Sequence, residues 1–91
     1  MNYHDYTLIP EHMMNSIQNY LNFGSPLGGF LHAVFSNDLT KACSRADEYN
    51  LKILPTYVIY IYNMCPMSSN GSEKAILEWM KAKQVESMSS F

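Results

Sequence analysis

The sequence predicts an all-α protein, a compact bundle of about four to five short helices. Three observations lead to this fold class. Apolar residues recur with helical spacing along most of the chain, and proline, serine and glycine residues fall where helices begin and end. Only the segments near 3–9 and 57–62 have strand character, so a sheet would have few strands to pair. The alternative is an α+β fold with one small hairpin.

The first helix is expected from Pro10 to Phe23. Proline favours the first helical position, and Glu11 behind it complements the positive end of the helix dipole. Gly24 lies just beyond the apolar residues, where a left-handed glycine commonly ends a helix. The apolar stripe of this helix comprises Met13, Met14, Ile17, Tyr20 and Leu21. Residues 1–9 lack a clear period and are expected to form a short edge strand or an extended arm.

Two further helices are expected between Ser25 and Leu54. Ser25 and Pro26 are typical of the N-cap and first position of a helix, which would continue to Phe35. Asp38 would cap a third, uninterrupted helix that runs to about Leu54. The buried stripe of this third helix comprises Leu39, Ala42, Cys43, Ala46, Tyr49 and Ile53.

The segment 57–64 has a strand-like composition, but we expect a fully buried helix because partner strands are scarce. Ser72 follows a loop and is expected to cap a final helix. The apolar stripe of this helix comprises Ile76, Trp79 and Met80. Residues 1–84 would then form a single helical domain, followed by a frayed C-terminal tail at 85–91.

Composition argues against several classes of function. The net charge is −2 and the six basic residues are scattered, whereas binding to double-stranded nucleic acid needs a clustered basic face. Cys43 and Cys65 form no CxxC pair, so they are expected to be buried apolar residues in a reducing cytoplasm. The histidines and cysteines lack metal-ligand spacing, and no apolar run approaches the roughly 18 residues of a membrane span.

Gly28 and Gly29 lie in the first turn of the second expected helix, where each glycine weakens a helix by about 1 kcal/mol relative to alanine. Free backbone N–H groups and the positive dipole end would make this turn a site for phosphate or carboxylate. The alternative is a stripe of small residues, Gly29, Ala33 and Ser36, against which another helix packs. The pattern is not a Walker loop, because no Gly-Lys-Ser/Thr follows it, and it is not a dinucleotide fingerprint, because no strand precedes it.

A group of polar residues follows the glycine pair. It comprises Asn37, Asp38, Arg45, Asp47 and Asn50. Arg45 suits bidentate recognition of phosphate or carboxylate, unless Asp38 or a helix C-terminus is its partner. Asn50 lies in the apolar stripe, where it would contact a purine edge or a ribose hydroxyl, or else bond to neighbouring backbone. Asn37, Asp38 and Asp47 are further candidates to contact ribose or base.

One histidine and several aromatic residues complete the candidate ligand site. His32 would donate a hydrogen bond to a phosphate, although such a histidine is also common as a half-exposed packing residue. Phe30 directly follows the glycine pair and is included as a ligand contact. Tyr49, Tyr57 and Tyr60 would stack on a base, and their alternative role lies in the core or at a subunit interface.

Catalysis is poorly supported by the sequence. There is no HExxH motif and no cysteine with an obvious basic neighbour. A hydrolase built from His32, Asp38 and Asp47 is the alternative. We therefore expect a protein that is not an enzyme and that uses no cofactor or metal.

Several short motifs carry a family resemblance. They are Ile9-Pro10-Glu11, Pro26-Leu27-Gly28-Gly29-Phe30-Leu31, Ser36-Asn37-Asp38-Leu39 and Arg45-Ala46-Asp47. With these motifs the chain resembles, from about Ile9 to Trp79, a widespread and mostly uncharacterised family of small phage and prophage proteins. That family often has a Trp-Gly-Ser turn before the last helix, whereas here Asn70 precedes Gly71-Ser72. The resemblance implies a phage accessory protein in the cytoplasm of an infected bacterium, where small phage proteins often counter host defence.

The polar residues and the resemblance predict a phage counter-defence protein that binds and sequesters a nucleotide-derived immune signalling molecule without catalysis. Such a sponge would be a homo-oligomer, because two subunits of so short a chain can together close a pocket. The ligand would be small and phosphorylated or nucleotide-derived. The alternative is a phage inhibitor that binds a bacterial defence protein directly through an aromatic surface. A third possibility is a structural phage protein, whose polar residues are caps and satisfied core groups.

Overall fold

A computed structural model of the chain describes residues 1–88, and of Ser87 only the backbone. Every regular element in this range is helical, which confirms the all-α class and makes the hairpin alternative wrong. The α-helices are α1 (Glu11–Phe23), α2 (Gly29–Phe35), α3 (Leu39–Arg45), α4 (Glu48–Lys52), α5 (Leu54–Met64) and α6 (Glu73–Met88). The short 3-10 helices η1 (Tyr6–Leu8) and η2 (Met67–Ser69) precede α1 and α6.

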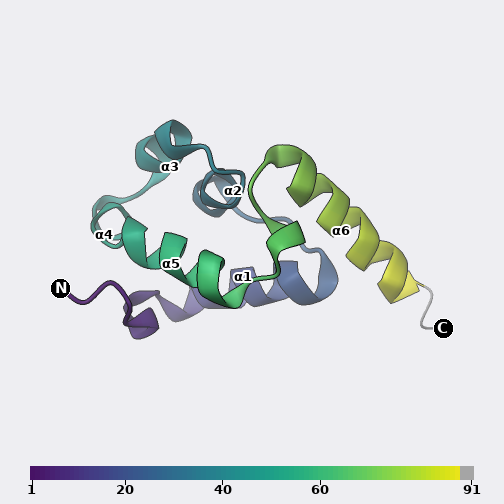
Figure 1. Cartoon of the computed structure of the whole chain (residues 1–91), viewed down its shortest axis with the longest axis horizontal. Helices are drawn as coiled ribbons and strands as arrows, with labels where there is room; N and C mark the ends of the chain where they lie inside the picture. The colour runs from purple at the N-terminus through teal and green to yellow at the C-terminus, as the bar shows by residue number, and fades with distance from the viewer. Residues whose placement is uncertain (89–91) are drawn as a thin grey trace.

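Helix α2 lies at the centre of the fold and contacts α3, α5 and α6 (Figure 1). α6 also packs against α1, and α4 leads directly into α5. The N-terminus and the end of α6 lie at opposite ends of the molecule (Figure 1). The helix that begins at the predicted glycine pair therefore contacts α3, α5 and α6, while α1 and α4 pack against α6 and α5.

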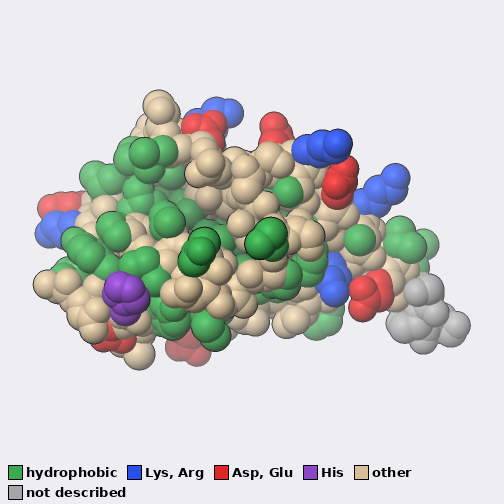
Figure 2. All heavy atoms as spheres, viewed as in Figure 1, with side chains coloured by type: hydrophobic (Ala, Val, Ile, Leu, Met, Phe, Trp, Pro, Cys, Tyr) green, Lys and Arg blue, Asp and Glu red, His purple; other side chains and the backbone are tan. Residues whose placement is uncertain are grey.

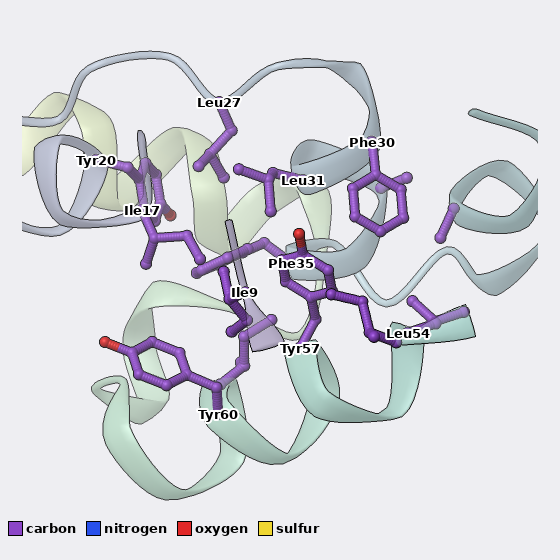
Figure 3. Close-up of a cluster of buried hydrophobic side chains, with 14 of the residues drawn as sticks. Ile9, Ile17, Tyr20, Leu27, Phe30, Leu31, Phe35, Leu54, Tyr57 and Tyr60 are labelled. Atoms are coloured by element: carbon purple, nitrogen blue, oxygen red, sulfur yellow. The ribbon is translucent and has the colours of Figure 1, made fainter. Parts of the chain in front are cut away.

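Apolar side chains from α1, α2, α5 and α6 meet in one core (Figure 3). The largest fully buried apolar side chains of the core are Ile17, Tyr20, Leu31, Phe35, Ile53, Tyr57 and Ile76. The Tyr20 hydroxyl donates a hydrogen bond to the Ser69 carbonyl at 2.7 Å, and the ring packs edge-on against Phe35. Burial raises the pKa of Tyr20 above its ordinary value. Large aromatic residues can fill this core because their polar ends find partners.

Helix α1 begins and ends close to where the sequence predicts. Pro10 immediately precedes it, and Gly24 ends it in the left-handed conformation with a φ of 72°. A Cβ atom at residue 24 would lie 2.6 Å from the Met80 carbonyl oxygen, so glycine also permits close contact with α6. The Trp79 indole donates a hydrogen bond to the Tyr20 carbonyl at 3.2 Å across the same contact.

Helix α2 begins at Gly29, so the predicted helix start at Ser25 and Pro26 is wrong. Gly28 is the N-cap residue and has an extended backbone, with φ −67° and ψ 169°. The segment before it is not helical, and Leu27 within it is buried in the core. Burial of this leucine outweighs the local preference of serine and proline for a helix start.

The predicted uninterrupted helix from Asp38 to Leu54 is wrong, because it is divided into α3 and α4. Ala46 has an extended backbone, and Asp47 caps α4 by accepting a hydrogen bond from the Asn50 amide at 2.7 Å. An aspartate side chain competes with the helix for such N–H groups, which favours a new cap here. Members of the predicted buried stripe are consequently exposed, namely Leu39, Cys43 and Tyr49.

Helix α5 confirms the helical prediction for the segment 57–64 and has Pro55 in its first turn. Its buried residues are Leu54, Thr56, Tyr57, Tyr60 and Ile61. The prediction of a fully buried helix is wrong, since Val58 and Tyr62 are 51% and 87% exposed. No other helix among residues 1–88 covers that face, so α5 carries apolar side chains on the surface.

Helix α6 begins as the sequence predicts, because the Ser72 hydroxyl accepts a hydrogen bond from the Ala75 amide at 3.0 Å. The predicted apolar stripe is buried or half-buried, and comprises Ile76, Trp79 and Met80. The helix continues to Met88, so residues 85–88 of the predicted frayed tail are helical, and residues 89–91 lie outside the described range.

The N-terminal segment forms neither the edge strand nor the extended arm that we expected. Hydrogen bonds from the Thr7 hydroxyl and amide to the Asp5 carboxylate cap η1 and hold the pKa of Asp5 below its usual range. Ile9, which follows η1, is buried in the core. The segment is therefore a short helical turn that is anchored at its end.

The two cysteines are free thiols in different surroundings. Cys65 is half-buried, and burial raises the pKa of its thiol to about 11. Cys43 is exposed on α3, so the prediction that both cysteines are buried is wrong for Cys43.

Candidate functional site

A pocket of about 380 Å³ is lined by residues of α2, α3 and the start of α6, together with the segments that precede α2 and α3. Its lining residues are Leu27, Gly29, His32, Ala33, Ser36, Asp38, Lys41, Arg45 and Glu73. Small-molecule sites in proteins typically have volumes of roughly 300–1,000 Å³. The pocket is thus large enough for a small ligand, and most of its polar side chains can carry charge.

Arg45 is the last residue of α3, and its side chain lies across Gly29 at the start of α2. A Cβ atom built on Gly29 would lie 2.7 Å from Arg45 Nη1 and 3.3 Å from Arg45 Cδ. Among the described residues, the Arg45 guanidinium makes no hydrogen bond or ion pair. Its donors therefore remain available to an anion that enters the pocket.

The other charged groups of the pocket are paired with one another. His32 Nε2 lies 3.7 Å from Glu73 Oε1, and Lys41 Nζ lies 4.0 Å from Asp38 Oδ2. Asp38 also caps α3 by accepting a hydrogen bond from the Lys41 amide at 3.1 Å. These contacts are largely exposed and contribute little to stability. Among the charged side chains that line the pocket, Arg45 is the one without a partner within the described residues.

Four of the predicted site residues line this pocket together, and they are Gly29, His32, Asp38 and Arg45. Gly28 lies immediately before them as the N-cap of α2, with its carbonyl accepting a hydrogen bond from the His32 amide at 2.8 Å. α2 has only seven residues, so its dipole is a weaker attraction for an anion than the Arg45 guanidinium.

Phe30, Asn50 and Tyr57 do not reach the pocket, which corrects their assignment as ligand contacts. The Tyr57 hydroxyl donates a hydrogen bond to Asn50 Oδ1 at 2.7 Å, and Phe30 packs edge-on against the Tyr57 ring. All three side chains are buried. Asn50 is thus a core residue satisfied by a neighbouring tyrosine, whose pKa is raised by burial.

Asp47, Tyr49 and Tyr60 also lie away from the pocket lining. Asp47 caps α4, and the Tyr49 hydroxyl donates a hydrogen bond to the Leu8 carbonyl. Tyr60 accepts a hydrogen bond from the Gln18 amide group at 2.8 Å, and burial raises its pKa. Each of these predicted ligand contacts has a hydrogen-bond partner elsewhere in the fold.

Asn37 lies next to the pocket and lines a separate hollow of about 210 Å³. This hollow has mostly apolar walls, formed by Val34, Phe35, Val58, Ile61, Tyr62, Asn70 and Gly71. Asn37 adopts a left-handed backbone with a φ of 64°, which asparagine tolerates better than most residues. Asn37 is a predicted ligand contact, but it lines this second hollow and not the pocket that contains Asp38 and Arg45.

Lys41 and Glu73 line the pocket and were not among the predicted site residues. Lys41 stands three residues after Asp38 and four before Arg45, so helical spacing alone places it on their flank. Glu73 opens α6, and no local pattern in the sequence indicates that this helix start comes to rest beside α2.

The geometry does not support the hydrolase alternative, because Asp47 does not join His32 and Asp38 in the pocket. Within residues 1–88, no three His, Cys, Asp or Glu side chains gather where they could bind a metal ion. In the same range, none of the helices has the length and apolar character needed to cross a membrane.

No protein-family model matches the chain, and searches of curated proteins and of solved structures gave no significant match. The chemistry of the pocket is therefore inferred from its own side chains.

Proposed function

We propose that this chain is a phage counter-defence protein that binds and sequesters a nucleotide-derived immune signalling molecule without catalysis. The observation that carries the proposal is the Arg45 guanidinium, which lies in the pocket without a partner among the described residues. A guanidinium forms two parallel hydrogen bonds to a phosphate group, and these are among the stronger polar contacts in proteins.

The remaining lining residues complement a ligand that has both phosphate and hydroxyl groups. Asp38 and Ser36 offer acceptors for ribose hydroxyls, and His32 offers a further donor. Leu27 and Ala33 supply an apolar wall. In this proposal Arg45 binds the anionic part of the ligand, while the other side chains recognise its sugar.

The phage context of the proposal comes from the sequence resemblance. Its most specific motifs, 28–31, 36–39 and 45–47, contribute Gly29, Ser36, Asp38 and Arg45 to the pocket. The proposal includes a homo-oligomer, in which a second copy of so short a chain would help to enclose the ligand.

A thermal-shift screen tests the proposal directly. The panel holds cyclic dinucleotides, ADP-ribose derivatives, common nucleotides and phosphosugars. A ligand at about 100 times its Kd stabilises the protein by about 2.7 kcal/mol, which raises the Tm of a domain this size by roughly 10–20 °C.

Arg45→Ala should reduce the affinity for the identified ligand by roughly tenfold or more, because charge-assisted hydrogen bonds are lost. Lys52→Ala is the matched control, since Lys52 lies on α4, away from the pocket, and pairs only weakly with Glu48 at 3.9 Å. Undiminished ligand affinity in Arg45→Ala would contradict the assignment of this pocket.

A second candidate function is inhibition of a bacterial defence protein through an apolar and aromatic surface. Hydrophobic side chains gather over the half of the molecule nearest the N-terminus, while charged side chains lie mostly at its edge (Figure 2). The exposed large hydrophobic residues on α5 and just after it include Val58, Tyr62, Met64 and Met67. If this function holds, Tyr62→Ser should abolish capture of the partner in pull-downs from infected cells, and Arg45→Ala should leave it intact.

A further inference from the structure

We infer that Gly29 is a positioning residue, because its lack of a Cβ atom allows Arg45 to lie across the start of α2 with its guanidinium in the pocket. This inference rests on the proposed function only for the statement that the pocket binds an anion. The placement of Arg45 by Gly29 stands on the geometry of the two residues.

The distances around Gly29 show what a larger residue would displace. A Cβ atom at this position would lie 2.7 Å from Arg45 Nη1, 3.3 Å from Arg45 Cδ and 3.7 Å from Arg45 Cζ. The three nearest atoms all belong to the flexible end of one side chain, and none belongs to the backbone. Alanine at 29 would therefore leave the helix in place and move the guanidinium.

The backbone gives no other reason for glycine at this position. The glycines with positive φ in the described range are Gly24 and Gly71, so Gly29 has a conformation that any residue adopts. Gly29 is also the first residue of α2, where alanine is a better helix former than glycine. The close approach of Arg45 is the feature that alanine would not permit.

Gly28 provides a matched control within the same motif. It also has a negative φ, and a Cβ atom there would meet no atom within 4 Å. Gly28→Ala therefore makes the same chemical change one residue away, without contact to Arg45.

The first measurement uses the single arginine of the chain. In ¹⁵N-labelled protein, the Nε–H group of Arg45 gives one arginine side-chain peak in the NMR spectrum. Arg45 is exposed, and the environment of its guanidinium is set by its contact with Gly29. We expect Gly29→Ala to move this peak, and Gly28→Ala to leave it in place. An unmoved peak in folded Gly29→Ala overturns the inference.

The second measurement is a titration with inorganic phosphate, followed by the backbone amide peaks around the pocket. Gly29→Ala should weaken phosphate binding by roughly fivefold or more, and should have no further effect in an Arg45→Ala background, because the two residues act as a unit. An equal effect of Gly29→Ala in both backgrounds overturns the inference, since it would then act without Arg45.

Two further outcomes separate this inference from the proposed function. If the wild-type protein does not bind phosphate, the proposed anion site fails, while the arginine peak still decides whether Gly29 positions Arg45. If Gly29→Ala does not fold, recovery of folding in Gly29→Ala/Arg45→Ala supports the inference, and continued failure to fold overturns it.

Discussion

Replacement of Tyr57 by phenylalanine should destabilise the fold by about 2 kcal/mol. Tyr57 is fully buried, and its hydroxyl donates a hydrogen bond to Asn50 Oδ1 at 2.7 Å. Asn50 is itself only 7% exposed, so water cannot readily replace the lost donor. A buried acceptor left unpaired in this way costs about 1–3 kcal/mol, and the middle of that range is our expectation.

The assay is thermal unfolding followed by circular dichroism. For a domain of this size, about 2 kcal/mol lowers the Tm by roughly 8–16 °C. Tyr62→Phe is the matched control, because the Tyr62 side chain is 87% exposed and loss of its hydroxyl should change little. A Tm for Tyr57→Phe that falls no further than that of Tyr62→Phe would refute the assignment of Tyr57 and Asn50 as a core pair.

Two other predictions concern Gly24 and Cys65. Gly24→Ala should lower the free energy of unfolding, measured in urea, by about 2 kcal/mol or more. The reason is that φ is 72° and the new Cβ would lie 2.6 Å from the Met80 carbonyl oxygen. Gly28→Ala is the control, and equal urea midpoints for the two variants would contradict the reasoning. Burial raises the pKa of Cys65 from 9.0 to about 11, so above pH 9 the unfolded chain releases a proton that the folded protein keeps until about pH 11. The contribution of Cys65 to stability should therefore be constant below pH 9 and be lost between pH 9 and 11, and a pH dependence that is unchanged in Cys65→Ala would show that this thiol plays no part.

The sequence predicts an element well where the deciding signals are local. Helix α1 has both its apolar stripe and its left-handed Gly24 within the segment itself, and Ser72 marks the start of α6 in the same way. The sequence does not predict the break between α3 and α4 at Asp47, because its local preferences for a continuous helix and for a new N-cap are similar. The start of α2 cannot be predicted locally for another reason. It depends on the burial of Leu27 in a core that is formed by distant segments of the chain.

The same distinction between local and distant signals applies to the residues of the candidate site. Helical spacing within one segment brings Asp38, Lys41 and Arg45 to the same flank of α3, so local sequence is enough to group them. Glu73 arrives from a distant helix, so no local pattern indicates it. Tyrosine suits both a base-stacking site and a core, so composition could not separate these roles. The burial of Tyr57 and its hydrogen bond to Asn50 place that pair in the interior.

All of the residues that line the pocket, except Glu73, lie between Leu27 and Arg45. α2 and α3 are consecutive helices joined by a short turn, so the loop that must close to bring them together is small and costs little chain entropy. Contacts between near neighbours in the chain also form faster than contacts between distant segments. Arg45 is therefore expected to reach Gly29 early in folding, and Glu73 to complete the wall of the pocket only when α6 docks.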